Sequence, residues 1–464
     1  MKKFFILIFF FLFALNAFSF DPQKEGRFLN FSDVHFDPFY DTTLVIKLMR
    51  TDYKKWEKVF LTSPIKMLSR YGNDSNYPLF KSSLQDMKAR IPYPEVIIIT
   101  GDFMSHNFNE NFEKYSGTNS TGERDNFIKK TIGFTQFMIT KYFPSSQIFV
   151  TVGNDDADCG NYMVKPGGKF LREFSRLWSK HISIKDQSKS FNYTFKKDAY
   201  GMAGFRGSKD RKMIILNTIF FSAGYKNLCG DTLADPGSDE LTWLRETLKN
   251  CRTQGFKTWL SFHIPPGIDI YNTIHGSGSC EEKVFTSWKE KYNDAFLRIV
   301  KDYKDVITGA FGGHYHRDDF RVIYDEKDPI SFIHLTPSIS PIYGNNPSYH
   351  IFKFDRSNHL LLNYETYYIK NLTGPDAAKW TFEYDFNKSF EQINITPASL
   401  NKVSSLILAD TIYRSKYIMY YTAHNDKPYP GDYADWFYNW CGIGHLDREE
   451  YVNCLCSDSA SVNH

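Results

Sequence analysis

Five short clusters of polar side chains that commonly bind metals occur along this chain, and each follows an apolar run. In chain order they read "SDVH", "GDF", "GNDD", "FHIPPG" and "GGHYH". The side chains with suitable ligand atoms are Asp33, His35, Asp102, Asn154, His263, His314 and His316. Carboxylate and imidazole groups suit borderline cations such as zinc, iron or manganese. On an extended segment, D-x-H and H-x-H spacings direct both side chains to one face, so each pair can hold one ion.

A single cluster of this kind has ordinary explanations, namely a core histidine, a helix cap or a turn aspartate. With 13 histidines in 464 residues, chance alone gives about 0.4 H-x-H pairs. The five clusters together are more informative, because each one closes an apolar run and they follow in order. They indicate a shared site.

The apolar runs are short, rich in β-branched and aromatic residues, and bounded by glycine or proline, which is typical of buried strands. Residues 239–251 and 293–303 have the apolar spacing of helices. Strands that alternate with helices predict a layered α/β fold, in which ligands bind on loops at the carboxyl ends of strands. The later runs 331–340, 348–354 and 360–369 have no helix between them, so we expect antiparallel strands of a second sheet.

The first 19 residues have the features of a signal peptide. Two lysines precede an apolar stretch at 4–15, and a small-x-small box follows at 17–19. The apolar stretch has 12 residues, fewer than the ~20 that a membrane span needs. We therefore expect a secreted protein, extracellular or lysosomal, with no transmembrane segment.

In this order the clusters resemble the calcineurin-like metallophosphoesterase pattern D-x-H, G-D, G-N-H-D/E, H and G-H-x-H. More narrowly, the chain resembles the acid sphingomyelinase and sphingomyelinase-like phosphodiesterase family, through "SDVHFDPFY", "IILNT", "HIPPG", "GGHYHRDDF" and "CGIGHLDREEYVNC". The resemblance implies a four-layer α/β/β/α sandwich over residues 20–385 and a small C-terminal helical domain over 386–464. The first metal motif lies close to the N-terminus, which leaves no room for a saposin domain and favours the sphingomyelinase-like members.

The resemblance also implies two zinc ions. The first ion would be bound by Asp33, His35 and His316, the second by Asn154, His263 and His314, and Asp102 would bridge them. This arrangement agrees with the general two-metal hydrolase, in which a hydroxide between the ions attacks phosphorus in line.

One position departs from the family pattern, because Asp155 stands where the family has a histidine that stabilises charge or protonates the leaving group. In one interpretation His106 of "GDFMSH" is the acid, and a buried Asp155 is itself protonated beside another acid, with Asp156 the obvious neighbour. In the other, the chain is a weakly active zinc-binding relative. The retained ligands and His106 favour activity.

The seven cysteines leave at least one unpaired, and spacing alone does not give their pairing. The resemblance implies a disulfide between Cys441 and Cys454. Glycosylation is expected at the sequons Asn73, Asn119, Asn192, Asn371, Asn387 and Asn394. The sequon at Asn30 lies within a predicted buried strand and is not expected to carry a glycan.

The composition, with 42% hydrophobic and 23% charged residues, predicts a globular protein. The small net charge of +3 argues neither for nucleic acid nor for an anionic membrane surface, and we expect no nucleic-acid partner. The resemblance predicts a phosphodiester substrate: sphingomyelin, cleaved to ceramide and phosphocholine, with peripheral membrane contact, or alternatively a nucleotide or CDP-choline. A secreted zinc-binding interaction protein is the rival outside the enzymes. A purple acid phosphatase is less favoured because Phe103 occurs where that class needs a tyrosine ligand.

Overall fold

The computed structural model describes residues 24–182, 189–227, 229, 234–372, 378–425 and 436–458. The predicted signal peptide, residues 1–19, lies outside this part of the chain. Among the described residues, no helix has the length and apolar character that a membrane crossing requires.

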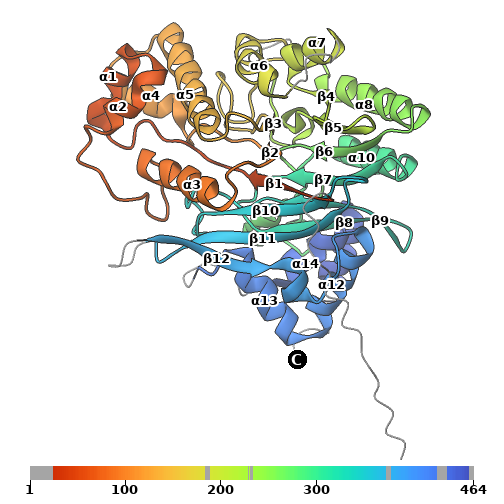
Figure 1. Ribbon diagram of the computed structural model, residues 1–464. Coiled ribbons are helices and arrows are strands. Elements are labelled where there is room, and N and C mark those ends of the chain that lie inside the picture. The colour runs from red at the N-terminus through yellow and green to blue at the C-terminus, as the bar shows by residue number, and fades with distance from the viewer. Residues whose placement is uncertain are drawn as a thin grey trace, which may run out of the picture.

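Two six-stranded sheets form the centre of the molecule (Figure 1). The first contains β1 (Glu25–Phe31), β2 (Val96–Ile99), β3 (Gln147–Val150), β10 (Ser348–Asp355), β11 (Leu361–Lys370) and β12 (Lys379–Asp385). The second contains β4 (Gly201–Gly204), β5 (Arg211–Ile215), β6 (Lys257–Ser261), β7 (Ile307–Gly312), β8 (Asp319–Asp325) and β9 (Asp328–Leu335). Their strand orders are β12-β11-β10-β1-β2-β3 and β4-β5-β6-β7-β9-β8.

The strands that precede the polar clusters are parallel neighbours. Strands β1, β2 and β3 run parallel in the first sheet, and β6 and β7 run parallel in the second. Every residue of β2 and β3 is buried, as expected for parallel strands covered on both faces. The carboxyl ends of parallel strands meet at one edge of a sheet, so the clusters that follow them are brought close together.

Aromatic side chains fill the space between the sheets. Phe28 of β1 stacks on Phe352 of β10, with ring centroids 4.7 Å apart. Phe28 also contacts Trp259 of β6 and Phe311 of β7 in the other sheet. Such pairs add roughly 0.5–1.5 kcal/mol each beyond the burial of their area, so this core fixes the sheets against each other.

Helices flank the two sheets (Figure 1). Those of the N-terminal and central parts are α1 (Val45–Arg50), α2 (Trp56–Phe60), α3 (Tyr77–Arg90), α4 (Phe108–Ser116), α5 (Thr121–Tyr142), α6 (Lys169–Ile182), α7 (Lys189–Asp198), α8 (Pro236–Thr253), α9 (Ile270–His275) and α10 (Glu290–Asp302). Helix α6 packs on β3, and α8 packs on β6. The fold class predicted from the sequence, a helix-flanked double sheet with helices at the C-terminus, is confirmed.

The C-terminal helices are α11 (Phe386–Phe390), α12 (Pro397–Ala409), α13 (Thr411–Tyr421), α14 (Trp436–Gly444) and α15 (Arg448–Asp458). Helices α12 and α14 pack against β8. Leu400 and Val403 of α12 belong to the same hydrophobic core as the strands. The C-terminal helices therefore extend the core of the second sheet.

The sequence prediction for the later strands was wrong in one respect. Strands β10 and β11 do pair antiparallel, but they belong to the first sheet, where β10 pairs with β1. Strand β9 stays in the second sheet and lies parallel to β7. An apolar run shows that a strand is buried, but its partner is chosen by packing between distant parts of the chain.

Three disulfides are present among the described residues: Cys159–Cys229, Cys280–Cys456 and Cys441–Cys454. The last joins α14 to α15 and is the pair that the resemblance implied. The second ties the loop after α9 to α15. Cys251 is free and buried, which accounts for the odd number of cysteines.

Candidate metal centre

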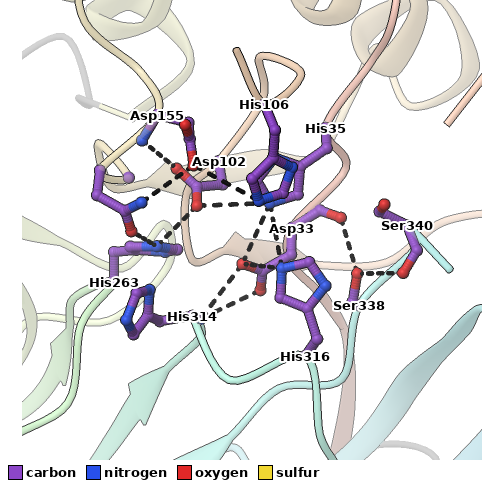
Figure 2. Close-up of polar contacts among 12 residues, drawn as sticks. Asp33, His35, Asp102, His106, Asp155, His263, His314, His316, Ser338 and Ser340 are labelled. Carbon is purple, nitrogen blue, oxygen red and sulfur yellow. Dashed lines mark hydrogen bonds and ion pairs between the residues drawn. The ribbon is translucent and has the colours of Figure 1, made fainter. Parts of the chain in front are cut away.

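The five polar clusters converge on one site (Figure 2). Asp33 and His35 follow β1, Asp102 follows β2, Asn154 follows β3, His263 follows β6, and His314 and His316 follow β7. Six of these side chains are buried, and His314 is half-buried. The structure therefore brings together all seven residues that the sequence singled out as ligands; six are labelled in Figure 2, and Asn154 contacts His263.

Asp102 lies at the middle of the site. Its Oδ2 is 3.0 Å from Nε2 of His263 and 3.5 Å from Nε2 of His35. On one side, Asn154 Oδ1 is 2.9 Å from the same nitrogen of His263. Asp102 thus lies between His263 and His35, and its function as a bridge between two metals stays a prediction.

On the other side of Asp102, Nε2 of His316 lies 3.2 Å from Nε2 of His35 and 3.4 Å from Oδ1 of Asp33. Two imidazole nitrogens at this separation and a carboxylate oxygen surround a common point. Such a donor set suits a cation. His/Asp groupings occur on both sides of Asp102, so the site suits a dinuclear metal centre.

Backbone carbonyls hold two of the histidines in a ligand-ready tautomer. Nδ1 of His35 lies 2.9 Å from the Met104 carbonyl oxygen, and Nδ1 of His263 lies 2.6 Å from that of Thr100. When Nδ1–H donates to a carbonyl, Nε2 keeps its lone pair for a metal. The Nδ1 of His316 is buried and has no hydrogen-bond partner among the described residues.

The amide of Asn154 is oriented by two neighbours in its own loop. Its Nδ2 donates to Asp155 Oδ2 at 3.0 Å and to Asn161 Oδ1 at 2.9 Å. With both amide hydrogens used, the Oδ1 atom faces His263 and the site. Asn161 was not identified from the sequence, because an asparagine within a loop gives no motif.

The backbone is left-handed rather than extended at five of the seven candidate ligands. The φ angles are 50° at Asp33, 39° at His35, 53° at Asp102, 75° at His314 and 59° at His316. The side chains of each D-x-H or H-x-H pair are thus aimed by turns, and the explanation by strand alternation was wrong. Residues with side chains adopt this conformation at an energetic cost and cluster at functional sites.

Close backbone approach is required where the GD and GN segments meet. A Cβ at Gly153 would lie 2.0 Å from Oδ1 of Asp102, and one at Gly101 would lie 2.8 Å from the Gly153 nitrogen. Gly101 also has a φ of 99°. Only glycine fits at either position. The glycines of the GD and GN motifs are therefore required by the contact between the two loops.

The electrostatics of the protein alone follow from this crowding. Burial raises the pKa of Asp102, but the charges of His263 and His35 outweigh it and hold that pKa well below its usual range. Burial lowers the pKa of His263, yet the carboxylate of Asp102 raises it to about 9. Burial and the charge of His263 lower the pKa of His314 to about 4. In the protein alone, the protonated form of His263 is thus favoured beside the ionised Asp102, and the neutral form of His314 is favoured.

His106 lies at the edge of the centre, with its ring stacked on that of His35 at 4.1 Å. Asp74 accepts hydrogen bonds from its backbone nitrogen at 2.8 Å and from Nδ1 at 3.0 Å. Nε2 of His106 is 3.2 Å from the Tyr343 hydroxyl. Burial and the charge of His35 lower the pKa of His106, but Asp74 and Asp155 raise it above its usual value overall. Neither Asp74 nor Tyr343 carries a sequence signal.

Asp155 is buried beside the centre, with Oδ2 3.7 Å from Nε2 of His106. Burial, followed by the charge of Asp102, raises its pKa to about 7. The neighbour expected from the sequence, Asp156, has another function, because it accepts hydrogen bonds from the backbone nitrogens of Phe103, Met104 and Gly153. Among the neighbouring acids, Asp102 raises the pKa of Asp155 most, and Asp74 raises it further.

Two adjoining cavities, of about 270 and about 530 Å³, open beside His314. Both are lined by Tyr162, Asp269, Asn272, His275 and His314. The smaller also contacts Tyr343, which binds His106. The site therefore combines a buried donor set with an accessible cleft in which a ligand can reach it.

Known proteins resemble this chain over most of its length. Residues 329–461 match the acid sphingomyelin phosphodiesterase C-terminal region. Acid sphingomyelinase-like phosphodiesterase 3b of Mus musculus is 26% identical over 444 residues, which cover 93% of this chain and 90% of the relative. The cyclic GMP-AMP phosphodiesterase SMPDL3A of Homo sapiens is 25% identical over 453 residues, covering 94% and 91%. A dimetal phosphatase structure from Danio rerio has 8% identity and a TM-score of 0.40, and covers 74% of this chain and 95% of its own.

The site and the relatives together indicate the class of protein, a phosphodiester hydrolase, as the sequence predicted. The chain is similar over most of its length to acid sphingomyelinase-like phosphodiesterases.

Proposed function

We propose that this chain is a secreted, zinc-dependent phosphodiesterase that hydrolyses sphingomyelin to ceramide and phosphocholine. The observation that supports catalysis most strongly is the convergence of six other candidate ligand side chains around the carboxylate of Asp102. The imidazole-rich donor set favours zinc over magnesium or calcium, which prefer oxygen ligands.

The residues present fit two metals. Asp33, His35 and His316 would hold one, and Asn154, His263 and His314 would hold the other, with Asp102 between them. Metals bound there would neutralise the phosphate and acidify a water molecule for attack on phosphorus. The protein itself contributes the buried, pre-aimed ligands and excludes bulk water around them.

His106 is the group that protonates the leaving alkoxide. Its ring stacks on a ligand histidine and is half-buried, so Nε2 reaches the edge of the centre. Asp74 binds the opposite nitrogen and keeps Nδ1–H in place. A histidine held by a carboxylate in this way donates a proton from Nε2, and such general acids contribute about 10²–10⁴-fold to rate.

Asp155 supports this arrangement in place of the usual histidine. Its carboxylate accepts from the amide of Asn154 and lies beside Nε2 of His106. It therefore orients a ligand and favours the protonated form of the acid. This favours an active enzyme over the alternative, a weakly active zinc-binding relative.

A nucleotide phosphodiester or CDP-choline is the second candidate substrate. The cleft beside the centre is lined by tyrosine rings, including Tyr162, Tyr271 and Tyr343. Aromatic faces stack on bases and also bind choline through cation–π contacts. A relative named as a cyclic GMP-AMP phosphodiesterase also favours this candidate.

Secretion is supported by the predicted signal peptide and by the three disulfides. Among the sequons, Asn73, Asn119 and Asn371 are exposed, and we propose them as glycan sites together with the half-buried Asn394. Asn387 is less suitable, because its Nδ2 donates to the carbonyl oxygens of Leu362 and Ile393. The side chain of Asn192 lies outside the described residues.

The proposal is tested by turnover of the zinc-loaded protein on sphingomyelin, CDP-choline, cyclic GMP-AMP and bis-p-nitrophenyl phosphate, from acidic to neutral pH. We expect hydrolysis of the simple diester and of sphingomyelin, and loss of both after chelation. Turnover of the nucleotides alone would select the second candidate. Zinc binding without turnover of any diester would show that the chain is a binding protein.

A further inference from the structure

Tyr162 is a tyrosine that the assignment above leaves without a function, and it lies at the boundary between the metal centre and the cleft. Its hydroxyl is 3.3 Å from Nε2 of His314. It also lines both cavities beside the centre. The ring is near-perpendicular to the His314 imidazole, with centroids 6.2 Å apart. The phenol thus contacts a ligand side chain and the space where a substrate would bind.

The backbone at Tyr162 is held in an unfavourable conformation. Its φ is 57°, which is uncommon for an aromatic residue and is maintained only when surrounding contacts determine it. Three contacts do so. Its nitrogen donates to the Asn154 carbonyl at 3.0 Å, its carbonyl accepts from Lys226 at 3.4 Å, and the disulfide Cys159–Cys229 links the same two loops.

The ring also requires a glycine opposite it. A Cβ at Gly224 would lie 3.1 Å from Cδ1 of Tyr162. The loop of Asn154 and the loop of Gly224 are therefore shaped around this one side chain. A strained and tightly held aromatic residue beside a reactive centre indicates a positioned group rather than a packing residue.

The contact with His314 determines which hydrogens are free. When His314 ligates through Nδ1, its Nε2 carries a hydrogen and donates to the Tyr162 oxygen. The phenol O–H then has no acceptor on His314 and is directed to another one. A phenol has an ordinary pKa near 10, so it is a hydrogen-bond donor at neutral pH.

We propose that Tyr162 is a further catalytic residue, whose hydroxyl donates a hydrogen bond to a non-bridging phosphoryl oxygen of the substrate. The proposal rests on the phosphodiesterase function proposed above. The bond strengthens as negative charge accumulates on that oxygen in the transition state, and no proton is transferred. Removal of one such preorganised donor lowers kcat by about 10²-fold or more.

The test compares Tyr162→Phe with Tyr225→Phe, each prepared as the full zinc-loaded chain. The control is matched, because the Tyr225 hydroxyl donates to the Val164 carbonyl in the same loop at 3.2 Å and does not touch the centre. For Tyr162→Phe we expect kcat to fall by about 10²-fold on bis-p-nitrophenyl phosphate and on sphingomyelin alike. The loss is equal because a non-bridging oxygen does not depend on the leaving group.

A second measurement does not use turnover. Calorimetric titration with inorganic phosphate should show roughly tenfold weaker binding to Tyr162→Phe, because a hydrogen bond to a charged oxygen is lost. Zinc content and binding to Tyr225→Phe should be unchanged. Unchanged kcat and phosphate affinity would overturn the proposal, and so would a loss of zinc, which would show that the hydroxyl only positions His314. If the wild-type chain cleaves no diester, the proposed function fails, whereas the phosphate titration still tests Tyr162.

Discussion

The substitution Asp74→Asn tests the assignment of His106 as the acid, because it removes a charge and keeps the shape. Asparagine can accept from the His106 backbone nitrogen with its oxygen and turn its amide toward Ser340, which now donates to Asp74 at 3.1 Å. Asp74 touches none of the proposed metal ligands through its side-chain hydrogen bonds, so zinc content should not change.

The size of the effect follows from the distance between the charges. At 3.0 Å and an effective dielectric of ~20, Coulomb's law gives about 5.5 kcal/mol as an upper limit for the pair. Measured shifts from one opposite charge are roughly 1–3 pKa units. Because the carboxylate favours the imidazolium, its removal lowers the pKa of His106 by that amount. The protonated acid is then lost at a lower pH.

The assay compares two phosphocholine esters that differ only in leaving group, sphingomyelin and p-nitrophenyl phosphorylcholine. The basic limb of kcat against pH for sphingomyelin should move down by about 1–3 units, and its rate at neutral pH should fall about tenfold or more. The p-nitrophenyl ester needs little protonation and should lose less than about threefold. The variant Ser340→Ala, which keeps the charge, is the control. Equal losses on both esters, or a basic limb that stays in place, would refute the assignment.

Three further predictions concern the centre and the fold. Asp102→Ala should lose both metals and all turnover, as measured by zinc content and rate, and retention of two equivalents would show that Asp102 is no bridge. Gly153→Ala should also abolish metal loading, since its Cβ would meet Asp102 Oδ1 at 2.0 Å, whereas Gly122→Ala, whose Cβ would lie 3.9 Å from Ser120 Oγ, should have no effect. Burial, and then the charge of Arg211, lower the pKa of His359 to about 4. As the pH falls, this imidazole is therefore protonated in the unfolded chain before it is protonated in the folded one. The stability that this group contributes is present above pH ~6.5 and should fall by about 3 kcal/mol as the pH drops to about 4. In denaturant unfolding, the free energy of unfolding of His359→Asn should therefore change less with pH than that of the wild-type chain.

Much of the fold, and the seven candidate ligands that the structure brings together, could be predicted from the sequence, because both depend on short local motifs. A buried parallel strand needs a continuous apolar run, and the residues after it lie at the ligand-binding edge of the sheet. The glycines of "GD" and "GN" are needed because the two loops lie so close together that no side chain would fit between them. These features follow from neighbours along the chain, so they appear as motifs.

The partners of His106 and Asn154 could not be predicted in this way. Asp74 lies in a loop 32 residues before His106, and Tyr343 lies 237 residues after it. Neither is part of a repeated or spaced pattern. The left-handed backbone of the ligand residues was likewise missed, because D-x-H has the same spacing on a strand and on a turn.

The sequence by itself determined the chemistry of this protein: which side chains can bind metals, in what order they occur, and that one family position holds Asp155. Only the tertiary structure decided how that chemistry is arranged. It placed β10 beside β1 and β11 beside β10, set Asp155 beside His106, and brought the Tyr162 hydroxyl to His314. The physical reason is that these contacts join loops far apart in the chain. Their geometry is set by the packing of two whole sheets, and no short stretch of sequence contains it.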